Sequence, residues 1–343
     1  MDFCTLGMLI IDDIRHAPPK PSSQNIIGGA GTFAVLGARL FRPYPNSKHI
    51  GWTVHRGHDF PENLSEELDS WQTGLQWIET PERQTTRALN EYIEGKGDDF
   101  RAFRYITEKL RIDETHLTDE MLQSKTIHMV CSPERCTNLV FGIQARRVKL
   151  GVLGLPVFVW EPVPDSCTTD AIQAVKDAAR YVDVVSPNVS ELAALFVAEA
   201  TPEEEMEHME QRCAALLDGP FGEKDGKLVI RCGSKGCYLR SNAERLMMPA
   251  YWSNSESTGT IVDPTGAGNA FLGGLCIGLL ADGPKWLTTL EKGAVYGTVA
   301  ASFAVEQVGV PRLSKGESGQ EFWNEDQVNM RLNYYLGRIY DSH

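Results

Sequence analysis

The segment Gly266-Ala267-Gly268 has the residue types and the setting of a site that binds an anion. An irregular Asp-Pro-Thr stretch ending at Thr265 precedes it, and a run of small residues typical of a helix begins at Asn269. Glycines allow neighbouring backbone N–H groups to converge, and the N-terminus of a helix adds partial positive charge. A phosphoryl group in transfer is an anion that such groups stabilise. The alternative is a tight strand-to-helix turn without a function of its own.

The elements that would position this segment follow from the hydrophobic pattern. From about residue 125 onward strands and helices alternate, which predicts an α/β fold with a doubly wound, mostly parallel sheet flanked by helices. We expect strands at 3–11, 49–54, 127–131, 152–160, 182–186 and 227–232, and a return strand at 237–240. We expect helices at 33–40, 61–70, 136–150, 168–181, 191–198, 201–218, 269–280 and 287–305.

Two stretches near the N-terminus have a different pattern. Prolines within 15–25 predict a loop. Residues 84–106 alternate between polar and apolar around a turn signal at 95–98, which predicts a hairpin. Arg87 and Arg104 in that hairpin could face a ligand or the solvent.

Several polar residues and glycines come directly after predicted strands. They are Asp12, Glu161, Asn188, Gly233 and Gly266. In open α/β sheets, ligands bind beyond the carboxyl ends of the strands. We therefore expect these five residues along one edge of the sheet.

Composition limits the class of protein. The chain has 343 residues, of which 42% are hydrophobic and 23% charged, as in a globular protein. Its formal net charge of −13 argues against a non-specific nucleic-acid binder, which needs clustered Lys and Arg. Neither an apolar run of about 18 residues nor a basic N-terminal region is present, so we expect no membrane span and no secretory signal. The eight Cys are then expected to be reduced thiols of a cytoplasmic protein.

The ten residues from Val262 to Phe271 resemble the second signature of the PfkB, or ribokinase-like, family of sugar and nucleoside kinases, usually D-T-x-G-A-G-D. Gly7 followed by Asp12 resembles the first-strand G-x-x-x-x-D of that family. The resemblance assigns Asp12 to sugar hydroxyls and lets the backbone of Gly28-Gly29 approach the sugar. It also implies a single ribokinase-like domain over 1–343, with a small β lid at about 12–28 and 84–106. Phe33 stands where the family often has an Asn.

Other motifs match the nucleotide side of the family site. Asn188-Val189-Ser190-Glu191 matches N-x-x-E, which organises phosphates and, through water, Mg²⁺. Taken alone, the two outer residues are equally typical of a helix N-cap. Gly233-Ser234-Lys235-Gly236 resembles the T-L-G-x-x-G nucleotide loop, with Arg231 and Cys232 in place of Thr and Leu. An Arg there could pair with a phosphate or lie in solvent. Thr265 and Thr298 are assigned to the nucleotide as well, Thr298 in the adenine pocket.

Asn269 is the main departure from the family pattern. The residue after G-A-G is an Asp in active members and acts as general base on the acceptor hydroxyl. A carboxamide cannot accept that proton usefully at neutral pH, and loss of a general base commonly costs about 10²- to 10⁴-fold in rate. Asn269 could still orient the hydroxyl, and Asp12 or Asp13 could act as base instead. The combination resembles a fungal branch of the family named for a killer-virus maintenance protein of yeast.

The resemblance implies ATP and Mg²⁺ as cofactors, with K⁺ as a further candidate, and Glu191 as the residue that reaches Mg²⁺ through water. A sugar, nucleoside or related polyol would be the acceptor, and relatives often pair as homodimers through their lids. Three hypotheses stay open: a small-molecule kinase, atypical or slow because of Asn269; a relative that binds nucleotide or sugar without turnover, as a sensor or partner; and an enzyme that uses the same pocket for other chemistry.

Overall fold

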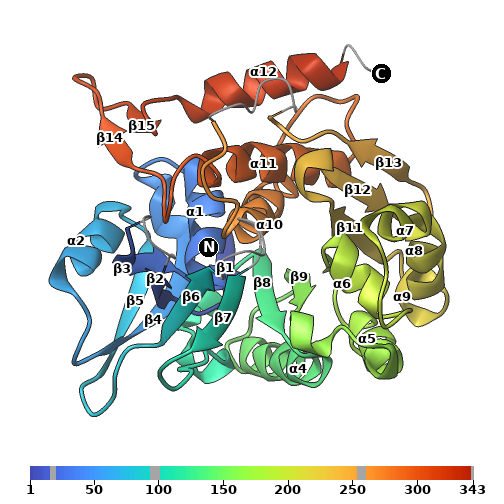
Figure 1. Ribbon diagram of the computed structural model, residues 1–343, viewed down its shortest axis with the longest axis horizontal. Helices are drawn as coiled ribbons and strands as arrows, with labels where there is room; N and C mark the ends of the chain where they lie inside the picture. Colours follow the sequence, from blue (N-terminus) through green and yellow to red (C-terminus); the bar gives the residue numbers. More distant parts are fainter. Residues whose placement is uncertain (16–20, 93–100, 253–259, 341–343) are drawn as a thin grey trace.

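The computed structural model describes residues 1–15, 21–92, 101–252 and 260–340. Its main sheet has nine strands in the order β13-β12-β11-β10-β9-β8-β1-β4-β5 (Figure 1). From β11 to β5 all neighbouring strands are parallel, and β12 and β13 add an antiparallel edge. The strands are β1 (Phe3–Thr5), β4 (Ile50–Gly57), β5 (Gly74–Thr80), β8 (Thr126–Cys131), β9 (Val157–Pro162), β10 (Val184–Val185), β11 (Lys227–Arg231), β12 (Cys237–Arg240) and β13 (Arg245–Met248).

Helices cover both faces of this sheet, because successive side chains of a strand point to opposite faces and here both are apolar. On β9, Val159 packs into one core, while Phe158 and Trp160 pack into the other. The first core includes residues of α1 (Ala30–Leu40), α2 (Glu62–Ser70), α10 (Ala267–Gly278), α11 (Thr289–Ala304) and α12 (Val328–Tyr340). The second includes α3 (Asp119–Leu122), α4 (Pro133–Lys149), α5 (Ile172–Ala179), α6 (Val189–Ala194), α8 (Met209–Leu217) and α9 (Pro220–Glu223). The predicted doubly wound sheet is confirmed.

The single strand predicted at 3–11 is wrong, since the segment forms two strands in two different sheets. β1 ends at Thr5, and β2 (Ile10–Arg15) belongs to a smaller sheet. Between them the chain turns against the start of α1: a Cβ on Gly7 would lie 2.6 Å from the backbone nitrogen of Gly31. A continuous apolar run does not reveal such a break, because both strands are buried.

The smaller sheet has four strands in the order β3-β2-β6-β7, with β3 at Ser23–Gly28, β6 at Arg87–Tyr92 and β7 at Arg101–Tyr105. β2 pairs antiparallel with β3 and parallel with β6, and β6 pairs antiparallel with β7. The two arms of the predicted hairpin are thus confirmed. Its turn signal at 95–98 lies outside the described residues.

Other boundaries differ locally from the prediction. β9 starts at Val157, not at 152, and the helix expected over 201–218 divides at His208 into α7 (Pro202–Glu207) and α8. The elements after residue 305 were not predicted: they are the two-stranded sheet β14 (Leu313–Lys315) with β15 (Glu321–Trp323), and α12. In Figure 1 the long α12 lies along the outside of α11.

Three findings concern the described residues taken together. All eight cysteines are buried and free, as expected of reduced thiols. Within the described ranges, no helix combines the length and apolar character that crossing a bilayer requires. In the same part of the chain, no group of three or more His, Cys, Asp and Glu could hold a metal ion.

Candidate functional site

A charged cluster lies where the carboxyl ends of β9 and β11 meet the first turns of α6 and α10. Glu161 comes from the end of β9, Glu191 from α6 and Arg231 from the end of β11. Asn269 lies in the first turn of α10. Parallel strands bring residues from distant parts of the chain to one edge, which is why these four meet.

Arg231 lies between two carboxylates. Its Nη2 is 2.7 Å from Oε1 of Glu161 and 3.3 Å from Oε2 of Glu191, and it donates to the carbonyl of Ser186 at 3.2 Å. On the other side, a Cβ added to Gly268 would overlap Nη1 of Arg231. The guanidinium therefore lies directly against the glycine segment. Of the two roles left open by the sequence, a solvated side chain is wrong, because the ion pairs hold Arg231 in the cluster.

Asn188 and Glu191 form the capping box of α6. The backbone N–H of Asn188 donates to Oε2 of Glu191, and that of Glu191 donates to Oδ1 of Asn188, both at 2.7 Å. Burial raises the pKa of Glu191 above its ordinary value, in spite of the Arg231 guanidinium. The helix-cap interpretation is therefore confirmed for both residues, and their role toward phosphates and Mg²⁺ stays a prediction.

Asn269 donates a hydrogen bond from Nδ2 to Oε2 of Glu161 at 2.6 Å. The sequence placed Glu161 after a strand and gave it no role. Burial opposes ionisation of this carboxyl, but Arg231 and His128 outweigh that effect and hold its pKa below its ordinary value. Glu161 is therefore a carboxylate at neutral pH.

His128 is the fifth residue of the cluster. It lies on β8 and is fully buried, with Nδ1 3.0 Å from Oγ1 of Thr5 and Nε2 3.8 Å from Oε2 of Glu161. Among the described residues, Nε2 has no hydrogen-bond partner. Sequence reasoning missed His128, because a lone His in an apolar strand gives no signal of a site.

A pocket of about 380 Å³ opens beside the cluster. Seven residues predicted for the site line it: Asn188, Gly233, Ser234, Gly236, Ala267, Gly268 and Thr298. Arg231 lines it too, and the remaining wall is mostly apolar, with Tyr251, Trp252 and Phe271. A flat, partly apolar ring attached to an anionic group fits this combination of walls.

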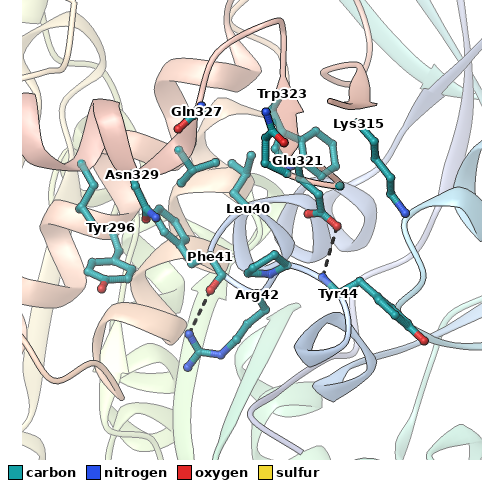
Figure 2. A pocket seen from close by; sticks show the side chains of 15 residues that line it. Leu40, Phe41, Arg42, Tyr44, Tyr296, Lys315, Glu321, Trp323, Gln327 and Asn329 are labelled. Atoms are coloured by element: carbon teal, nitrogen blue, oxygen red, sulfur yellow. Dashed lines mark hydrogen bonds between the residues drawn. The ribbon is translucent and has the colours of Figure 1, made fainter. Parts of the chain in front are cut away.

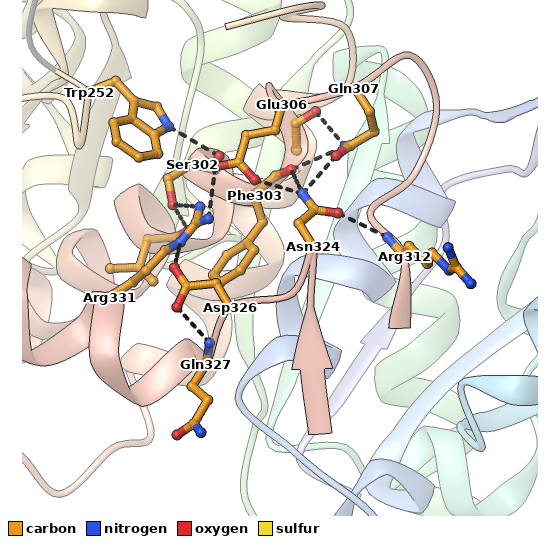
Figure 3. A network of polar contacts seen from close by, with 12 residues as sticks. Trp252, Ser302, Phe303, Glu306, Gln307, Arg312, Asn324, Asp326, Gln327 and Arg331 are labelled. Carbon is orange, nitrogen blue, oxygen red and sulfur yellow. Dashed lines mark hydrogen bonds and ion pairs between the residues drawn. The ribbon is translucent and has the colours of Figure 1, made fainter. Parts of the chain in front are cut away.

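Helix α12 holds one wall of this pocket in place. Arg331 is buried, pairs with Glu306 at 2.8 Å and Asp326 at 2.7 Å, and donates to Oγ of Ser302 at 3.1 Å (Figure 3). Its guanidinium also lies 5.5 Å from the ring centroid of Trp252, whose Nε1 donates to the carbonyl of Ser302. Ser302 and Trp252 line the pocket, so the arginine acts on its shape without reaching it.

A second, much smaller cavity lies under the four-stranded sheet. Its volume is about 10 Å³, and Asp12, Asn90, Asp263 and Thr265 line it together with Ile14, Ile26, Ile27, Phe33 and Gly309. Asp12 thus lies in the smaller sheet and not at the end of a main-sheet strand. Thr265, expected beside the nucleotide, lines this cavity, where its hydroxyl donates to Oδ1 of Asp263 at 2.5 Å.

The glycines expected near the sugar, Gly28 and Gly29, do not line this cavity, although Gly28 lies against Asp12, which does. A Cβ on Gly28 would overlap the carboxylate of Asp12, and Gly29 has a φ of 93° at the start of α1. Gly266 has a φ of 78°, and a Cβ there would overlap the ring of Phe33. Phe33 therefore fills the space between α1 and the glycine segment.

The two arginines of the hairpin have different surroundings. Arg87 pairs with Asp59 at 2.6 Å and donates to Oδ1 of Asn25 at 2.9 Å, so its charge is paired within the protein. Arg104 is exposed.

Another cavity, of about 370 Å³, lies between the end of α1 and the C-terminal elements (Figure 2). Its polar groups hold the fold together. Glu321 accepts from Nη1 and Nη2 of Arg39, each at 2.7 Å, and from the backbone N–H of Tyr44 at 3.2 Å, while Arg42 pairs with Asp2 at 2.8 Å. No residue predicted for the site lines this cavity, and we do not take it as the functional site.

Comparisons with known proteins agree with the sequence resemblance. Residues 20–314 match the family described as pfkB family carbohydrate kinase. The chain is 33% identical to an uncharacterized protein of Schizosaccharomyces pombe, over 98% of this chain and 92% of that one. It is 32% identical to Protein MAK32 of Saccharomyces cerevisiae, over 97% of this chain and 92% of that one.

A solved structure shows the same fold. It is an E. coli protein described as a ribokinase II, in complex with ATP and Mg²⁺. The TM-score is 0.64 at 16% identity, and the match covers 98% of this chain and 99% of that one. The four-stranded sheet thus corresponds to the lid of a ribokinase-like fold.

Proposed function

The chain belongs to the pfkB family of carbohydrate kinases, and from that premise we propose that it transfers the γ-phosphoryl group of ATP to a hydroxyl of a small polyol, sugar or nucleoside. The pocket of about 380 Å³ would take the nucleotide, and the cavity that Asp12 lines would take the acceptor. The glycine segment lies between the two.

The position of Arg231 carries this proposal. Its side chain lines the large pocket and lies against Gly268, so a phosphate at the N-terminus of α10 would meet both a guanidinium and converging backbone N–H groups. A fixed positive charge at that point stabilises the charge that develops on the transferring group. The glycine segment and Arg231 thus form one anion site at the inner end of the pocket.

The rest of the pocket suits the nucleoside part of ATP. Tyr251, Trp252 and Phe271 supply aromatic and apolar walls, and Thr298 supplies a polar group within them. The ribose-phosphate would then lie along Gly233, Ser234 and Gly236, where the backbone can approach closely.

Mg²⁺ fits this site in the way it usually binds beside nucleotides, through a single carboxylate, water and the phosphates. Glu191 is the carboxylate that would hold it through water, although Arg231 lies 3.3 Å from the same oxygen that caps α6. When bound, the ion would neutralise phosphate charge. K⁺ stays a prediction of the family resemblance alone.

The acceptor side needs a movement of the lid. A volume of about 10 Å³ holds about one water, not a sugar. The four-stranded sheet carries Asp12, Ile14, Ile26 and Asn90, so its displacement would open the cavity and present the carboxylate of Asp12 to acceptor hydroxyls. We propose that this sheet covers the acceptor during transfer and excludes water.

A specific substitution tests the nucleotide site. Gly268→Val would push a branched side chain into Arg231 and the anion site, and we expect it to weaken ATP-Mg²⁺ binding by about 10- to 100-fold, the worth of one or two charge-assisted hydrogen bonds. Gly337→Ala is the matched control, because no atom lies within 4 Å of the added Cβ. Isothermal titration calorimetry measures both. Unchanged affinity in Gly268→Val would contradict the nucleotide site.

Turnover separates the kinase from a second candidate, a nucleotide-binding protein without catalysis, which Asn269 favours because it removes the usual base. Purified protein would be given ATP-Mg²⁺ and a panel of polyols, sugars and nucleosides, with ADP release and phosphorylated product measured together. Product formation supports the kinase. Saturable ATP binding without product from any acceptor supports the second candidate.

A further inference from the structure

We propose that Glu161 is the general base of the phosphoryl transfer and that Asn269 orients it. The usual base of the family would then have moved from the first turn of α10 to the end of β9. This inference rests on the proposed function, since it concerns the proton of the acceptor hydroxyl in that reaction.

The distance between the two side chains is the main argument. Nδ2 of Asn269 takes the place of one carboxylate oxygen of an Asp, and Oε2 of Glu161 lies 2.6 Å from it. A carboxylate oxygen is therefore present within one hydrogen bond of the place where the family base would act. A general base must lie within hydrogen-bonding reach of the proton it accepts, and Oε2 of Glu161 meets that condition for a hydroxyl beside Asn269.

The state of Glu161 agrees with the role. Arg231 at 2.7 Å fixes Oε1, and Asn269 fixes Oε2, so the carboxylate is oriented before an acceptor arrives. Its side chain is 11% exposed, so burial of this carboxylate is not complete. Each carboxylate oxygen accepts about two hydrogen bonds, so Oε2 can still accept one from an acceptor hydroxyl.

His128 supports the carboxylate from the protein interior. Its Nε2 is buried, lacks a hydrogen-bond partner among the described residues and points to Oε2 of Glu161 at 3.8 Å. At 3.8 Å this contact is longer than a hydrogen bond, so Oε2 keeps its second acceptor place for the hydroxyl, while His128 helps to lower the pKa of Glu161. His128 is thus a positioning residue for Glu161, itself fixed by Oγ1 of Thr5 at 3.0 Å.

The reaction transfers one proton to Glu161 and one phosphoryl group to the acceptor oxygen. The acceptor hydroxyl gives its proton to Oε2 of Glu161, and an electron pair of its oxygen forms the new bond to the γ-phosphorus of ATP. The bond between that phosphorus and the oxygen bridging to the β-phosphate breaks, and ADP leaves with the electron pair. The products are a phosphate monoester, ADP and protonated Glu161, which then releases its proton to solvent.

The pairing also changes what is expected of position 269. Asn269→Asp alone would put two carboxylates about 2.6 Å apart, and such a pair holds a proton and titrates at raised pKa values. That variant regains the family residue without an ionised base at low pH. Glu161→Gln together with Asn269→Asp keeps the hydrogen bond with its direction reversed and moves the carboxylate back to α10.

Four proteins test the proposal: wild type, Glu161→Gln, Asn269→Asp and the double variant. We expect Glu161→Gln to lower kcat by about 10²- to 10⁴-fold while ATP still binds. Asn269→Asp should shift the acid limb of the kcat profile to higher pH, and the double variant should regain most of the lost kcat. ATP titration and thermal unfolding show which variants are folded, and Glu161→Ala serves as a second variant without the carboxylate if Glu161→Gln is not.

The outcomes distinguish failure of the role of Glu161 from failure of the proposed kinase activity. Wild-type kcat in Glu161→Gln, or in Glu161→Ala if that variant is the one tested, with product still formed, overturns the role of Glu161 and leaves the proposed kinase intact. If wild type binds ATP but no acceptor yields product, the proposed function fails and the role of Glu161 with it. Activity in the double variant alone would show a site that holds nucleotide but has no base in its natural form, which also overturns the proposal.

Discussion

At the scale of single residues, we expect Phe33 to limit the size of the acceptor in the proposed site. It is 2% exposed, lines the cavity of about 10 Å³ and packs against Gly266, at a position where a smaller polar residue is frequent in the family. Six atoms of an aromatic ring occupy space that an acceptor would otherwise share. The acceptor range of this chain should therefore differ from that of relatives with Asn at this position.

We expect Phe33→Leu to lower the KM for bulky acceptors, because it enlarges the cavity beside the glycine segment. The substitution should also reduce stability by on the order of 1–2 kcal/mol. Phe158→Leu is the control, since Phe158 is also 2% exposed but belongs to the core on the opposite face of the sheet. Acceptor kinetics and urea unfolding measure both effects. Equal changes of KM in the two variants would contradict the role of Phe33.

Among the site residues, sequence analysis identified motifs whose members are close together in the chain. It missed pairs of residues that only the fold brings together. The glycine segment and the capping box of Asn188 and Glu191 are local patterns, and both were found. Glu161 is 108 residues from Asn269, and neither residue type alone indicates the pair. Arg231 was recognised as a possible phosphate ligand, but its two carboxylate partners come from different elements.

At the scale of elements, α12 fixes the outer wall of the proposed nucleotide pocket. Tyr335 donates to the carbonyl of Pro249 at 2.6 Å, and Arg338 donates to the carbonyls of Ala250 and Tyr251, each at 2.5 Å. Together with Arg331 these contacts hold the chain that leads to Trp252. The helix begins at Val328, beyond the residues that match the family, so this support is supplied by a part of the chain outside the matched region.

We expect Arg331→Met to weaken ATP binding as well as stability, because Trp252 and Ser302 lose the group that holds them. Arg39→Met is the matched control: Arg39 is fully buried and pairs with Glu321 at 2.7 Å, far from the nucleotide pocket in the chain and outside its lining. Each variant should lose about 3–5 kcal/mol of stability, the usual result of breaking a buried ion pair. Calorimetry well below the unfolding temperature should show a raised Kd for ATP only in Arg331→Met. A raised Kd in both variants would mean that the loss of stability, and not a local change at Trp252 and Ser302, weakens ATP binding.

The predicted elements were recovered best where one pattern runs through a whole strand or helix. β8, β11, α1 and α2 lie within a few residues of their predicted ranges. The strand predicted at 3–11 failed because both halves are buried and only the close approach of Gly7 to Gly31 separates them. The C-terminal helix was missed; it packs on α11 and, through Tyr335 and Arg338, on the segment that follows β13.

At the scale of the whole molecule, paired carboxylates tie together segments that are distant in the chain. Asp2 pairs with Arg42 and Lys125, Asp59 with Arg87, and Glu321 with Arg39. Burial raises the pKa of each of these carboxyls, but the basic partners and hydrogen bonds outweigh it, so all three pKa values lie below their ordinary range. The contacts that join these distant segments therefore require ionised carboxylates.

Acid should destabilise the protein through these three paired carboxyls. A carboxyl whose pKa is lower in the folded than in the unfolded state binds its proton more readily after unfolding, so protonation favours unfolding. The stability from these pairs is complete above the unfolded pKa, about 4–4.5, and is lost as the pH falls through the lower folded value. Below the sequence pI of about 5.1 the net charge is positive and grows as the pH falls, so self-repulsion adds to the loss.

Glu321→Gln isolates one of these contributions. At pH 7 the variant should be less stable than wild type by roughly 1.5–3 kcal/mol, because Arg39 keeps an oxygen acceptor but loses the charge. The difference should shrink as the pH falls below about 4.5, since Glu321 first binds a proton in the unfolded chain and then, at its lower folded pKa, in the native protein as well. Glu67→Gln is a control of opposite sign: burial raises the pKa of Glu67, so its removal should increase stability at neutral pH. Urea unfolding between pH 3.5 and 7 measures both, and a Glu321→Gln difference that stays constant over this range would contradict the ionic origin of the contact.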